Sequence, residues 1–324
     1  MVLVSGKTSA DYALAAQAYA MGDFTTAHDE YRQLAGEGDS RAQYDLGIML
    51  INGEGGAVDY PAAARWFSAA ADQGHEAAQY NIGVFALRGI GIPQDFFVAF
   101  RWFSAVAGPQ QPSASYNLAL LYEQGRGTAL STEKARQWYQ VAAGVGHQQA
   151  MYSLGQVLYE GVGGEADVEQ ALSWFQQAAD LGSAEAQYNL AGLYYLGDGV
   201  EQNFDQAAHW YQQAAEQGDA LAQFNLGRMY RFGEGVEKDM LTAANWYQKA
   251  ARQGDSYALN NLAYMMFNGL GVDEDPVLAM ALFTLAKQAG NSNAGMALEL
   301  LKPQLGLDEI NRAEQIAQTW LNGK

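Results

Sequence analysis

Apolar and polar positions alternate along this chain with the spacing of amphipathic helices, and the pattern itself recurs every 36 residues. The stretch Ala184–Gly218 contains two apolar stripes separated by a polar, glycine-containing segment. The first stripe consists of Ala186, Leu190, Leu193 and Tyr194, at positions i, i+4, i+7 and i+8. The second stripe consists of Ala207, Trp210, Tyr211, Ala214 and Ala215. This spacing predicts two helices joined by a loop, each with one face turned toward a core.

The two aromatic markers of this stretch recur in phase without an insertion or deletion. Tyr188 is matched by Tyr44, Tyr80, Tyr116, Tyr152 and Phe224. Trp210 is matched by Trp66, Trp102, Trp138, Trp174 and Trp246. A fixed period of this length is typical of repeats that bury their apolar faces against their neighbours. We therefore predict an all-α protein, a right-handed superhelical α-solenoid of antiparallel helix pairs.

Turn and cap residues fit the same plan. Each repeat carries a glycine pair between its helices: Gly53/Gly55, Gly89/Gly91, Gly125/Gly127, Gly161/Gly163, Gly197/Gly199, Gly233/Gly235 and Gly269/Gly271. A capping residue then stands at one site, as Asp59, Asp95, Ser131, Asp167, Asn203, Asp239 and Asp275. Such side chains accept hydrogen bonds from the first turn of a helix. The glycine pairs are therefore interpreted as interhelical turns rather than as phosphate-binding loops.

Aromatic and alanine positions together predict the core. Alanine recurs at one site as Ala63, Ala99, Ala135, Ala171, Ala207, Ala243 and Ala279, which allows two helices to approach closely. We expect the Trp and Tyr rings to fill the space beside it, so that Trp138 and Trp174 are buried. The aromatic stripe is then a core and not a cofactor site.

Departures from the repeat define the expected domain organisation. Residues 1–9 are expected to be a disordered lead, 10–38 a compressed repeat of tetratricopeptide type, 39–290 seven full repeats and 291–324 capping helices. Pro109 and Pro112 stand where other repeats have a helix end, which predicts an early helix stop. The last helix carries Ile310, Ala313, Ile316, Ala317 and Trp320 on one face.

Composition narrows the classes of function. Lysine and arginine number 18 against 36 aspartates and glutamates, a net charge of −18, which argues against nucleic acid and anionic membranes as partners. The absence of cysteine excludes disulfides and thiol catalysis. The start lacks the pattern of a signal peptide, so we expect a cytoplasmic protein unless the chain is a mature or trimmed form of an exported one. No apolar run is long enough to span a membrane.

No catalytic or metal-binding pattern accompanies the repeats. His28, His75, His147 and His209 lack the spacing of metal ligands, and no nucleophile motif is present. We therefore expect no enzymatic activity, no metal and no cofactor. A hydrolase with a cryptic site is the least favoured alternative.

The repeat AQYNLAGLYYLGDGVEQNFDQAAHWYQQAAEQG resembles the Sel1-like repeats, relatives of the tetratricopeptide repeats, in spacing, glycines, Trp-Tyr pair and alanines. The resemblance covers residues 39–290 and points to the bacterial type. It implies a scaffold for proteins or peptides, such as an adaptor, a regulator or an immunity-type protein. A purely architectural envelope protein is the alternative. It also implies that a recurring asparagine of the first helix lies on a concave face and can hold a peptide backbone.

That asparagine site directs the choice of candidate residues. Asparagine recurs there as Asn81, Asn117, Asn189, Asn225 and Asn261, although it is a mediocre helix former. It either holds a ligand or bonds the neighbouring repeat, and both interpretations stay open. Positions three and seven residues further on vary from repeat to repeat, so the fold does not dictate them. The predicted ligand-binding set is Asn189, Leu196, Asn225, Arg228, Phe232, Asn261 and Tyr264.

A second candidate surface is purely electrostatic. No lysine or arginine occurs from Gln137 to Gly227, whereas eleven carboxylates do. Glu160, Asp198 and Glu201 represent this acidic docking zone. Acidic surfaces also serve solubility. The complete exclusion of basic residues nevertheless predicts a partner with a basic surface, bound to a chain that we expect to be a monomer.

Overall fold

The computed structural model describes residues 11–322, and this part of the chain contains α-helices, one 3₁₀ turn and no strand. The disordered lead predicted for residues 1–9 lies outside the described residues. The chain divides into two compact units between Ala166 and Asp167. The N-terminal unit comprises α1 (Tyr12–Ala20), α2 (Phe24–Glu37), α3 (Ser40–Asn52), α4 (Tyr60–Asp72), α5 (Glu76–Arg88), α6 (Phe96–Val106), α7 (Pro112–Gln124), α8 (Thr132–Ala143) and α9 (Gln148–Glu160). The C-terminal unit comprises α10 (Val168–Asp180), α11 (Ala184–Leu196), α12 (Phe204–Glu216), α13 (Ala220–Phe232), α14 (Met240–Gln253), α15 (Ser256–Phe267), α16 (Pro276–Gln288), α17 (Ser292–Leu301), η1 (Lys302–Gln304) and α18 (Leu307–Asn322).

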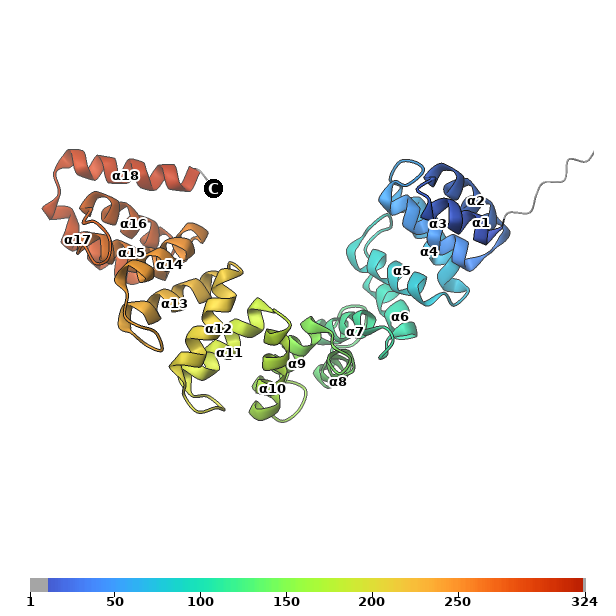
Figure 1. Cartoon of the computed structure of the whole chain (residues 1–324), viewed down its shortest axis with the longest axis horizontal. Coiled ribbons are helices and arrows are strands. Elements are labelled where there is room, and N and C mark those ends of the chain that lie inside the picture. The colour runs from blue at the N-terminus through green and yellow to red at the C-terminus, as the bar shows by residue number, and fades with distance from the viewer. Residues whose placement is uncertain (1–10, 323–324) are drawn as a thin grey trace, which may run out of the picture. The chain divides into compact units, whose positions relative to one another are not determined.

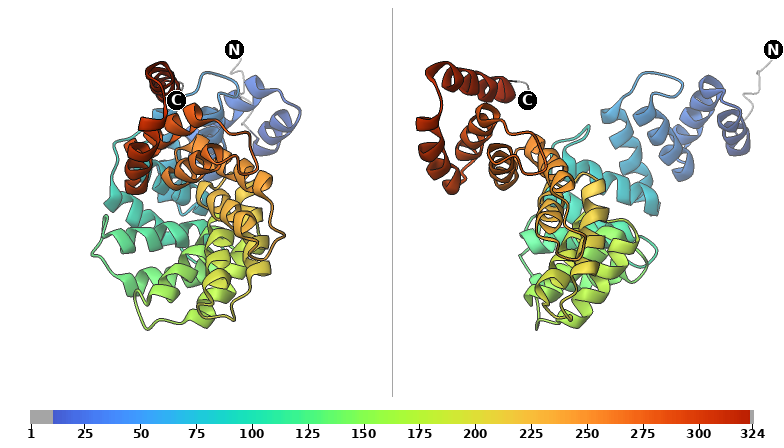
Figure 2. Two further views of the ribbon diagram at one scale, coloured as in Figure 1. Left: turned by 90° about the vertical axis from the view of Figure 1, so that its left-hand side faces the viewer. Right: turned by 60° about the vertical axis from the view of Figure 1, so that its left-hand side comes forward.

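Helices in each unit succeed one another in chain order (Figure 1). The two helices of a pair, such as α11 and α12 or α13 and α14, pack on each other, and the second helix of a pair packs on the first helix of the next. Both further views agree with this succession inside each unit (Figure 2). This arrangement is an α-solenoid of helix pairs, as the repeat predicts.

Every predicted capping residue of the second helices caps its helix. In α14, the carboxylate of Asp239 accepts hydrogen bonds from the backbone N–H groups of Leu241 and Thr242 at 2.9 and 3.1 Å. The corresponding caps begin the other six helices: Asp59, Asp95, Ser131, Asp167, Asn203 and Asp275. These bonds satisfy N–H groups that the helix itself leaves unpaired.

The glycine pairs are turns, and their second member also marks a contact between repeats. Both members of every pair have positive φ. At Gly127, a Cβ atom would overlap the backbone carbonyl of Phe96, which begins the second helix of the preceding repeat. The loop therefore packs directly on a neighbouring helix start. A side chain at Gly127 is disfavoured for two reasons: its φ is positive, and its Cβ atom would overlap the neighbouring backbone.

Core burial differs from the prediction in one respect. The tryptophans Trp138 and Trp174 are only partly buried, so the expectation that they are fully buried is wrong. The most buried ring is the residue after the tryptophan: Tyr139 and Tyr247 are at most 1% exposed. One residue along a helix is a rotation of about 100°, which turns the second ring to the centre of the interface and the tryptophan to its edge.

Small residues of the first helices make room for these buried rings. A Cβ atom on Gly227 would touch the ring of Tyr247, and one on Gly83 would touch that of Phe103. The recurring alanines of the second helices, such as Ala243, are buried as predicted. The core is therefore built from close helix approach and buried aromatic rings, to which Trp102 and Trp210 also belong.

Glutamine side chains tie one repeat to the next. Buried Gln187 donates its amide N–H to the carbonyl of Ala179 at 3.1 Å, and Gln217 donates to the Gln187 amide oxygen at 2.8 Å. Gln223 and Gln253 repeat this pattern one repeat later, with the carbonyl of Ala215 as acceptor. Each relay adds a side-chain donor to a carbonyl near a helix end, which also accepts the backbone N–H of Gly182 or Gly218.

The proline segment ends its helix early, as predicted. Helix α6 stops at Val106, and Ala107 is extended. A short turn follows, in which the Ser115 hydroxyl accepts the N–H of Gly108 at 2.8 Å, and Pro112 opens α7. Pro112 is tolerated there because the first turn of a helix needs no intrahelical N–H.

The C-terminal helices cover the last repeat. Helix α18 packs on α16 and buries Ala313 and Ala317. Ile310, Ile316 and Trp320 pack against the same core cluster. The apolar face read from the sequence is thus the face that α18 turns toward the repeats.

Candidate functional site

One face of the C-terminal unit carries all seven residues of the predicted ligand-binding set. These residues occupy positions i+4, i+7 and i+11 of a stripe along the first helices α11, α13 and α15. On α13 the stripe reads Leu221, Asn225, Arg228 and Phe232; on α15 it reads Tyr257, Asn261, Tyr264 and Asn268; on α11 it ends in Asn189, Gly192 and Leu196. We call these three stripes together the first-helix face. The spacing places the members of each stripe on one side of their helix.

Large apolar side chains on this face are open to solvent. Leu196 is 70% exposed, Phe232 58% and Tyr264 44%. The structure adds Leu221 and Tyr257, exposed to 49% and 60%, which the sequence-based set missed. Their signal was available, since both stand four residues before a recurring asparagine. A row of exposed rings and aliphatic groups is a feature of interaction surfaces.

The asparagine amides take part in bonds within the protein. Asn225 and Asn261 donate to the carbonyls of Leu221 and Tyr257, one turn earlier, at 3.0 and 2.9 Å. The amide oxygen of Asn261 accepts a bond from Arg231 of the preceding repeat at 2.7 Å. The interpretation that these amides bond the neighbouring repeat thus has direct support at Asn261. A role in holding a ligand stays a prediction.

Two arginines occupy the centre of the first-helix face. The guanidinium carbon of Arg228 lies 4.5 Å from the ring centre of Tyr195 on α11, a cation–π contact. That of Arg231 lies 4.9 Å from the Tyr264 ring and 5.2 Å from the Phe232 ring. The ion pairs within residues 11–322 all involve other side chains. Both positive charges are therefore held by aromatic rings and amides rather than by carboxylates.

Supporting groups hold the Tyr195 ring beneath Arg228. The Tyr195 hydroxyl donates to the carboxylate of Glu234 at 2.9 Å, which joins α11 to the loop after α13. Burial raises the pKa of Tyr195, and the positive charge of Arg228 partly offsets this rise. Burial also raises the pKa of Tyr188, again with an opposing effect of Arg228. Sequence reasoning missed Tyr195 and Glu234, because their contacts join residues 33 and 39 positions apart, which differ from the 36-residue period.

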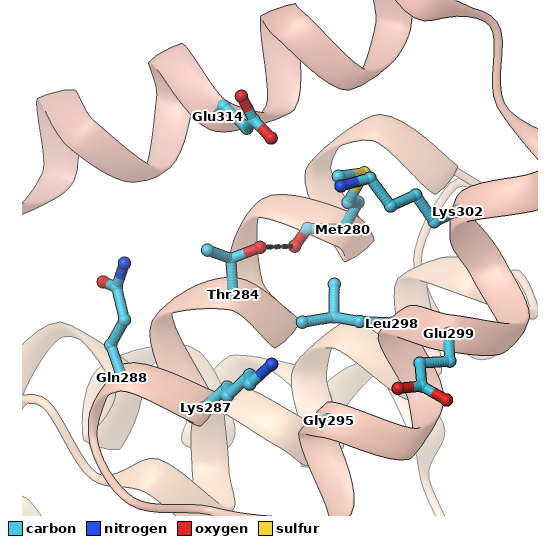
Figure 3. Close-up of a pocket in the computed structure, with 9 residues that line it drawn as sticks. All are labelled: Met280, Thr284, Lys287, Gln288, Gly295, Leu298, Glu299, Lys302 and Glu314. Carbon is cyan, nitrogen blue, oxygen red and sulfur yellow. Dashed lines mark hydrogen bonds between the residues drawn. The ribbon is translucent and has the colours of Figure 1, made fainter.

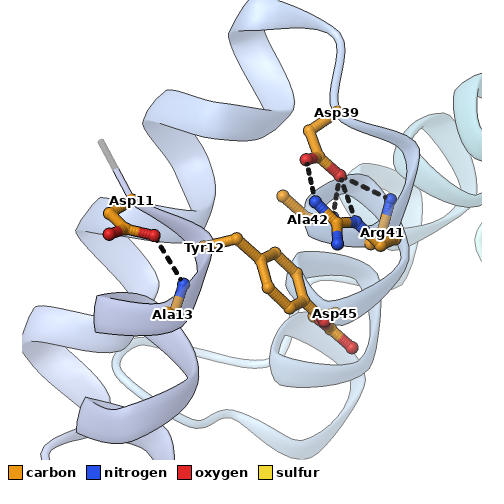
Figure 4. Close-up of polar contacts among 7 residues, drawn as sticks. All are labelled: Asp11, Tyr12, Ala13, Asp39, Arg41, Ala42 and Asp45. Atoms are coloured by element: carbon orange, nitrogen blue, oxygen red, sulfur yellow. Dashed lines mark hydrogen bonds and ion pairs between the residues drawn. The ribbon is translucent and has the colours of Figure 1, made fainter. Parts of the chain in front are cut away.

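The N-terminal unit contains a related cluster with the opposite charge balance (Figure 4). Arg41 lies 4.3 Å from the ring centre of Tyr12, but it also forms an ion pair with Asp39 at 2.8 Å. The Tyr12 hydroxyl donates to Asp45 at 2.6 Å, and Asp45 stands at the recurring asparagine site. Burial raises the pKa of Asp45, while the bond from Tyr12 opposes the rise.

The acidic docking zone is divided between the units. Glu160 is an exposed residue of the N-terminal unit. Asp198 is half-buried and Glu201 is exposed, both in the loop between α11 and α12 of the C-terminal unit. The role of these three carboxylates in docking stays a prediction.

A cavity of about 580 Å³ lies between α16, α17 and α18 (Figure 3). Its walls carry Lys287, Lys302, Glu299 and Glu314 around Leu298, with Glu314 extending from α18 toward α16. The Thr284 hydroxyl already donates to the carbonyl of Met280 at 2.8 Å. Mixed charges around an apolar floor define no reacting group. No sequence pattern predicts this cavity, because α18 lies outside the repeats.

Chemistry-bearing clusters are sparse in the part of the chain that the structure describes. Within it, no group of three or more histidines, aspartates or glutamates is arranged to hold a metal ion. None of the described helices is both long and apolar enough to cross a membrane.

Helix pairs in register, glycine turns and an open first-helix face define an α-solenoid repeat protein. Sel1 repeats match at residues 40–75, 76–105, 112–147, 148–183, 184–219, 220–255 and 256–291, so the chain belongs to the Sel1 repeat family. The shortened second match ends where α6 stops early. The match begins close to the predicted boundary at residue 39 and ends at 291 rather than 290.

Two solved structures illustrate the likeness. A Sel1 repeat protein from Oxalobacter formigenes is 32% identical, with a TM-score of 0.71 over 89% of this chain and 86% of that one. The protein c5321, a protective antigen present in uropathogenic Escherichia coli strains, is 28% identical, with a TM-score of 0.51 over 96% and 83%. No curated protein matches this sequence. These likenesses concern the fold and the family, and repeats of this kind typically mediate protein interactions.

Proposed function

We propose that this protein is a non-enzymatic scaffold that binds a protein or peptide ligand on the first-helix face of its C-terminal unit. The observation that carries the proposal is the exposure of Leu196, Phe232 and Tyr264 beside Arg228. Aromatic and arginine side chains are the usual anchors of protein interfaces. An adaptor, regulator or immunity-type role is compatible with such a face.

The test is partner capture with a double variant. Phe232→Ala with Tyr264→Ala should weaken capture by roughly 2 kcal/mol or more, because both rings are expected to be anchors. The matched control is Leu241→Ala, which removes a side chain of similar exposure (57%) from the second helix α14. Identification of the captured protein and its affinity for each purified variant form the measurement. An unchanged affinity, or early unfolding of the double variant, contradicts the proposal.

The partner is further proposed to present a basic surface to the acidic docking zone. Complementary charges mainly raise association rates and are screened beyond roughly 8 Å at physiological salt. We expect the association rate constant to fall between low and high salt. Replacing Glu160, Asp198 and Glu201 with glutamine or asparagine should flatten that dependence. A rate constant independent of salt would leave these carboxylates a solubilising surface only.

A purely architectural role is the main rival. It requires contacts through chain ends or edges and leaves the first-helix face unoccupied. The Phe232→Ala, Tyr264→Ala double variant separates the two roles, since an architectural contact would be insensitive to both residues. Sedimentation of the purified protein checks the accompanying expectation that it is a monomer.

A further inference from the structure

The most unusual feature of the first-helix face is a positive charge without a carboxylate. Arg228 is half-buried, and its Nε atom is buried with no hydrogen-bond acceptor among the described residues. The ion pairs of that same part of the chain leave out both Arg228 and Arg231. Withdrawing an unpaired charge from water costs free energy. The free protein thus bears a cost that an anion could relieve.

The two arginines are not equivalent. Arg231 already donates to Asn261 at 2.7 Å and lies against two rings. Arg228 has only the face of Tyr195, at 4.5 Å, as a described partner. Because they stand three residues apart on α13, both guanidinium groups project from one side of the helix. Arg228 is therefore the group with more unused donor capacity, and Arg231 is a second donor beside it.

Surrounding residues restrict what the anion can be attached to. Phe232 and Tyr264 are exposed on one side of the arginines and Leu221 on another, so apolar groups flank the charge. Glu234 accepts the hydroxyl of Tyr195, the ring over which Arg228 lies, and the repeats on either side carry further carboxylates. A polyanion would be repelled by these carboxylates, whereas a single negative charge on an otherwise apolar or basic chain would not.

We propose that Arg228, assisted by Arg231, binds a carboxylate side chain of an extended peptide segment whose neighbouring apolar residues pack on Phe232 and Tyr264. The inference rests on the proposed function and specifies its ligand. Arginine suits this role because its planar fork of donors matches a carboxylate in two parallel hydrogen bonds. The basic surface expected of the partner then lies outside this central contact.

The test begins with a random phage-displayed 12-residue peptide library selected on the full chain. Enriched sequences should carry aspartate or glutamate at a fixed distance from an aromatic or aliphatic residue. Synthetic peptides in acid form and with the acid replaced by its amide are then compared by fluorescence polarisation. The acid form should bind at least about tenfold more tightly to the wild-type chain.

Variants assign that preference to one residue. Arg228→Met keeps the packing of the stem and should abolish the difference between acid and amide peptides, while Arg228→Lys should keep part of it. The matched control is Arg252→Gln, which removes an exposed positive charge from the last turn of α14 and should leave the difference intact. Circular dichroism confirms that each variant is folded.

The outcomes separate this inference from the proposed function. Peptides that need Phe232 and Tyr264 but show no preference for an acid would overturn the carboxylate contact and leave the binding face standing. A phosphoserine peptide that binds tenfold more tightly than the acid form would overturn the carboxylate in favour of phosphate. Failure to enrich any peptide dependent on Phe232 and Tyr264 would overturn both.

Discussion

Arg41 in the N-terminal unit and Arg228 in the C-terminal unit both lie over a tyrosine ring, at 4.3 and 4.5 Å, yet their electrostatic environments are opposite. Arg41 is paired with Asp39, and a partly buried carboxylate stands nearby at Asp45. Arg228 has no carboxylate within ion-pair distance in the described residues, and the position equivalent to Asp45 is Asn225.

The same kind of arginine–tyrosine contact can therefore either hold two helices together or remain available to bind a ligand. In the N-terminal unit the tyrosine, aspartates and arginine satisfy one another and join α1 to α3 (Figure 4). In the C-terminal unit the same kind of contact leaves donor capacity unused. Since a paired surface cation gains little from a ligand, only the second arrangement suits binding.

The largest expected effect tests whether both units share one core. Tyr139→Ala in the N-terminal unit and Tyr247→Ala in the C-terminal unit should each cost about 3–5 kcal/mol of unfolding free energy, as deletions of buried rings. Trp138→Ala should cost less, because its ring is partly exposed. Hydrogen exchange should show loss of protection in neighbouring repeats as well. A Trp138→Ala cost equal to that of Tyr139→Ala would contradict the burial order.

A single substitution in the C-terminal unit should give Arg228 the paired environment that Arg41 has in the N-terminal unit. Asn225→Asp places a carboxylate three residues before Arg228, at the position of Asp45. We expect affinity for an acid-bearing peptide to fall about tenfold, since the guanidinium would then be paired within the chain. Fluorescence polarisation with acid and amide peptides measures this. Unchanged affinity for the acid peptide would mean that Arg228 does not bind the carboxylate of the peptide.

The opposite substitution, Asp45→Asn, should stabilise the N-terminal unit. Burial raises the pKa of Asp45 above its ordinary value of about 4, so the folded state holds a proton that the unfolded state releases. Stability therefore decreases as pH rises through the window between those two pKa values. Asp45→Asn should raise the unfolding free energy by up to about 1 kcal/mol at pH 7, and the gain should shrink below about pH 5 and vanish only at about pH 3, below the unfolded pKa. A gain that is as large at pH 3 as at pH 7 would rule out ionisation as its cause.

The smallest effect concerns helix caps. His147 caps α9 through Nδ1, which accepts the N–H of Ala150 at 3.3 Å, whereas Asp219 caps α13 at the equivalent place. Burial lowers the pKa of His147, so this contribution is present above about pH 6.5 and is lost as pH falls through the lower folded value.

Between pH 7.5 and 5 we therefore expect the amides of α9 to lose protection by on the order of 1 kcal/mol, whereas those of α13 do not. His147→Asp should remove this loss. Hydrogen exchange corrected for intrinsic rates is the measurement. Equal losses in α9 and α13 would show that the histidine cap does not govern the acid response.

The sequence predicted the parts of the fold that recur. Helix pairs, all seven second-helix caps and the glycine turns followed from residues at fixed spacing. It predicted both rings of the Trp-Tyr pair as core, whereas at Trp138 only the neighbouring Tyr139 is fully buried, because both lie on one apolar stripe and the packing decides between them. The candidate residues of the first-helix face were found because they vary within the repeat. Tyr195 and Glu234 were missed, since their partners are 33 and 39 residues away and no periodic signal links them.

The glutamine relays limit how the length of such a chain can change. Gln187 and Gln223 each reach a carbonyl eight residues earlier, and each accepts from a glutamine 30 residues later. Excision of residues 184–219 would put Gln223 in the place of Gln187, opposite the carbonyl of Ala179. Excision of only part of residues 188–216 would change the 30-residue spacing that lets Gln217 donate to Gln187. Insertions and deletions that keep these bonds therefore comprise whole repeats of 36 residues, and evolution or engineering can widen or narrow the binding face only by one repeat at a time.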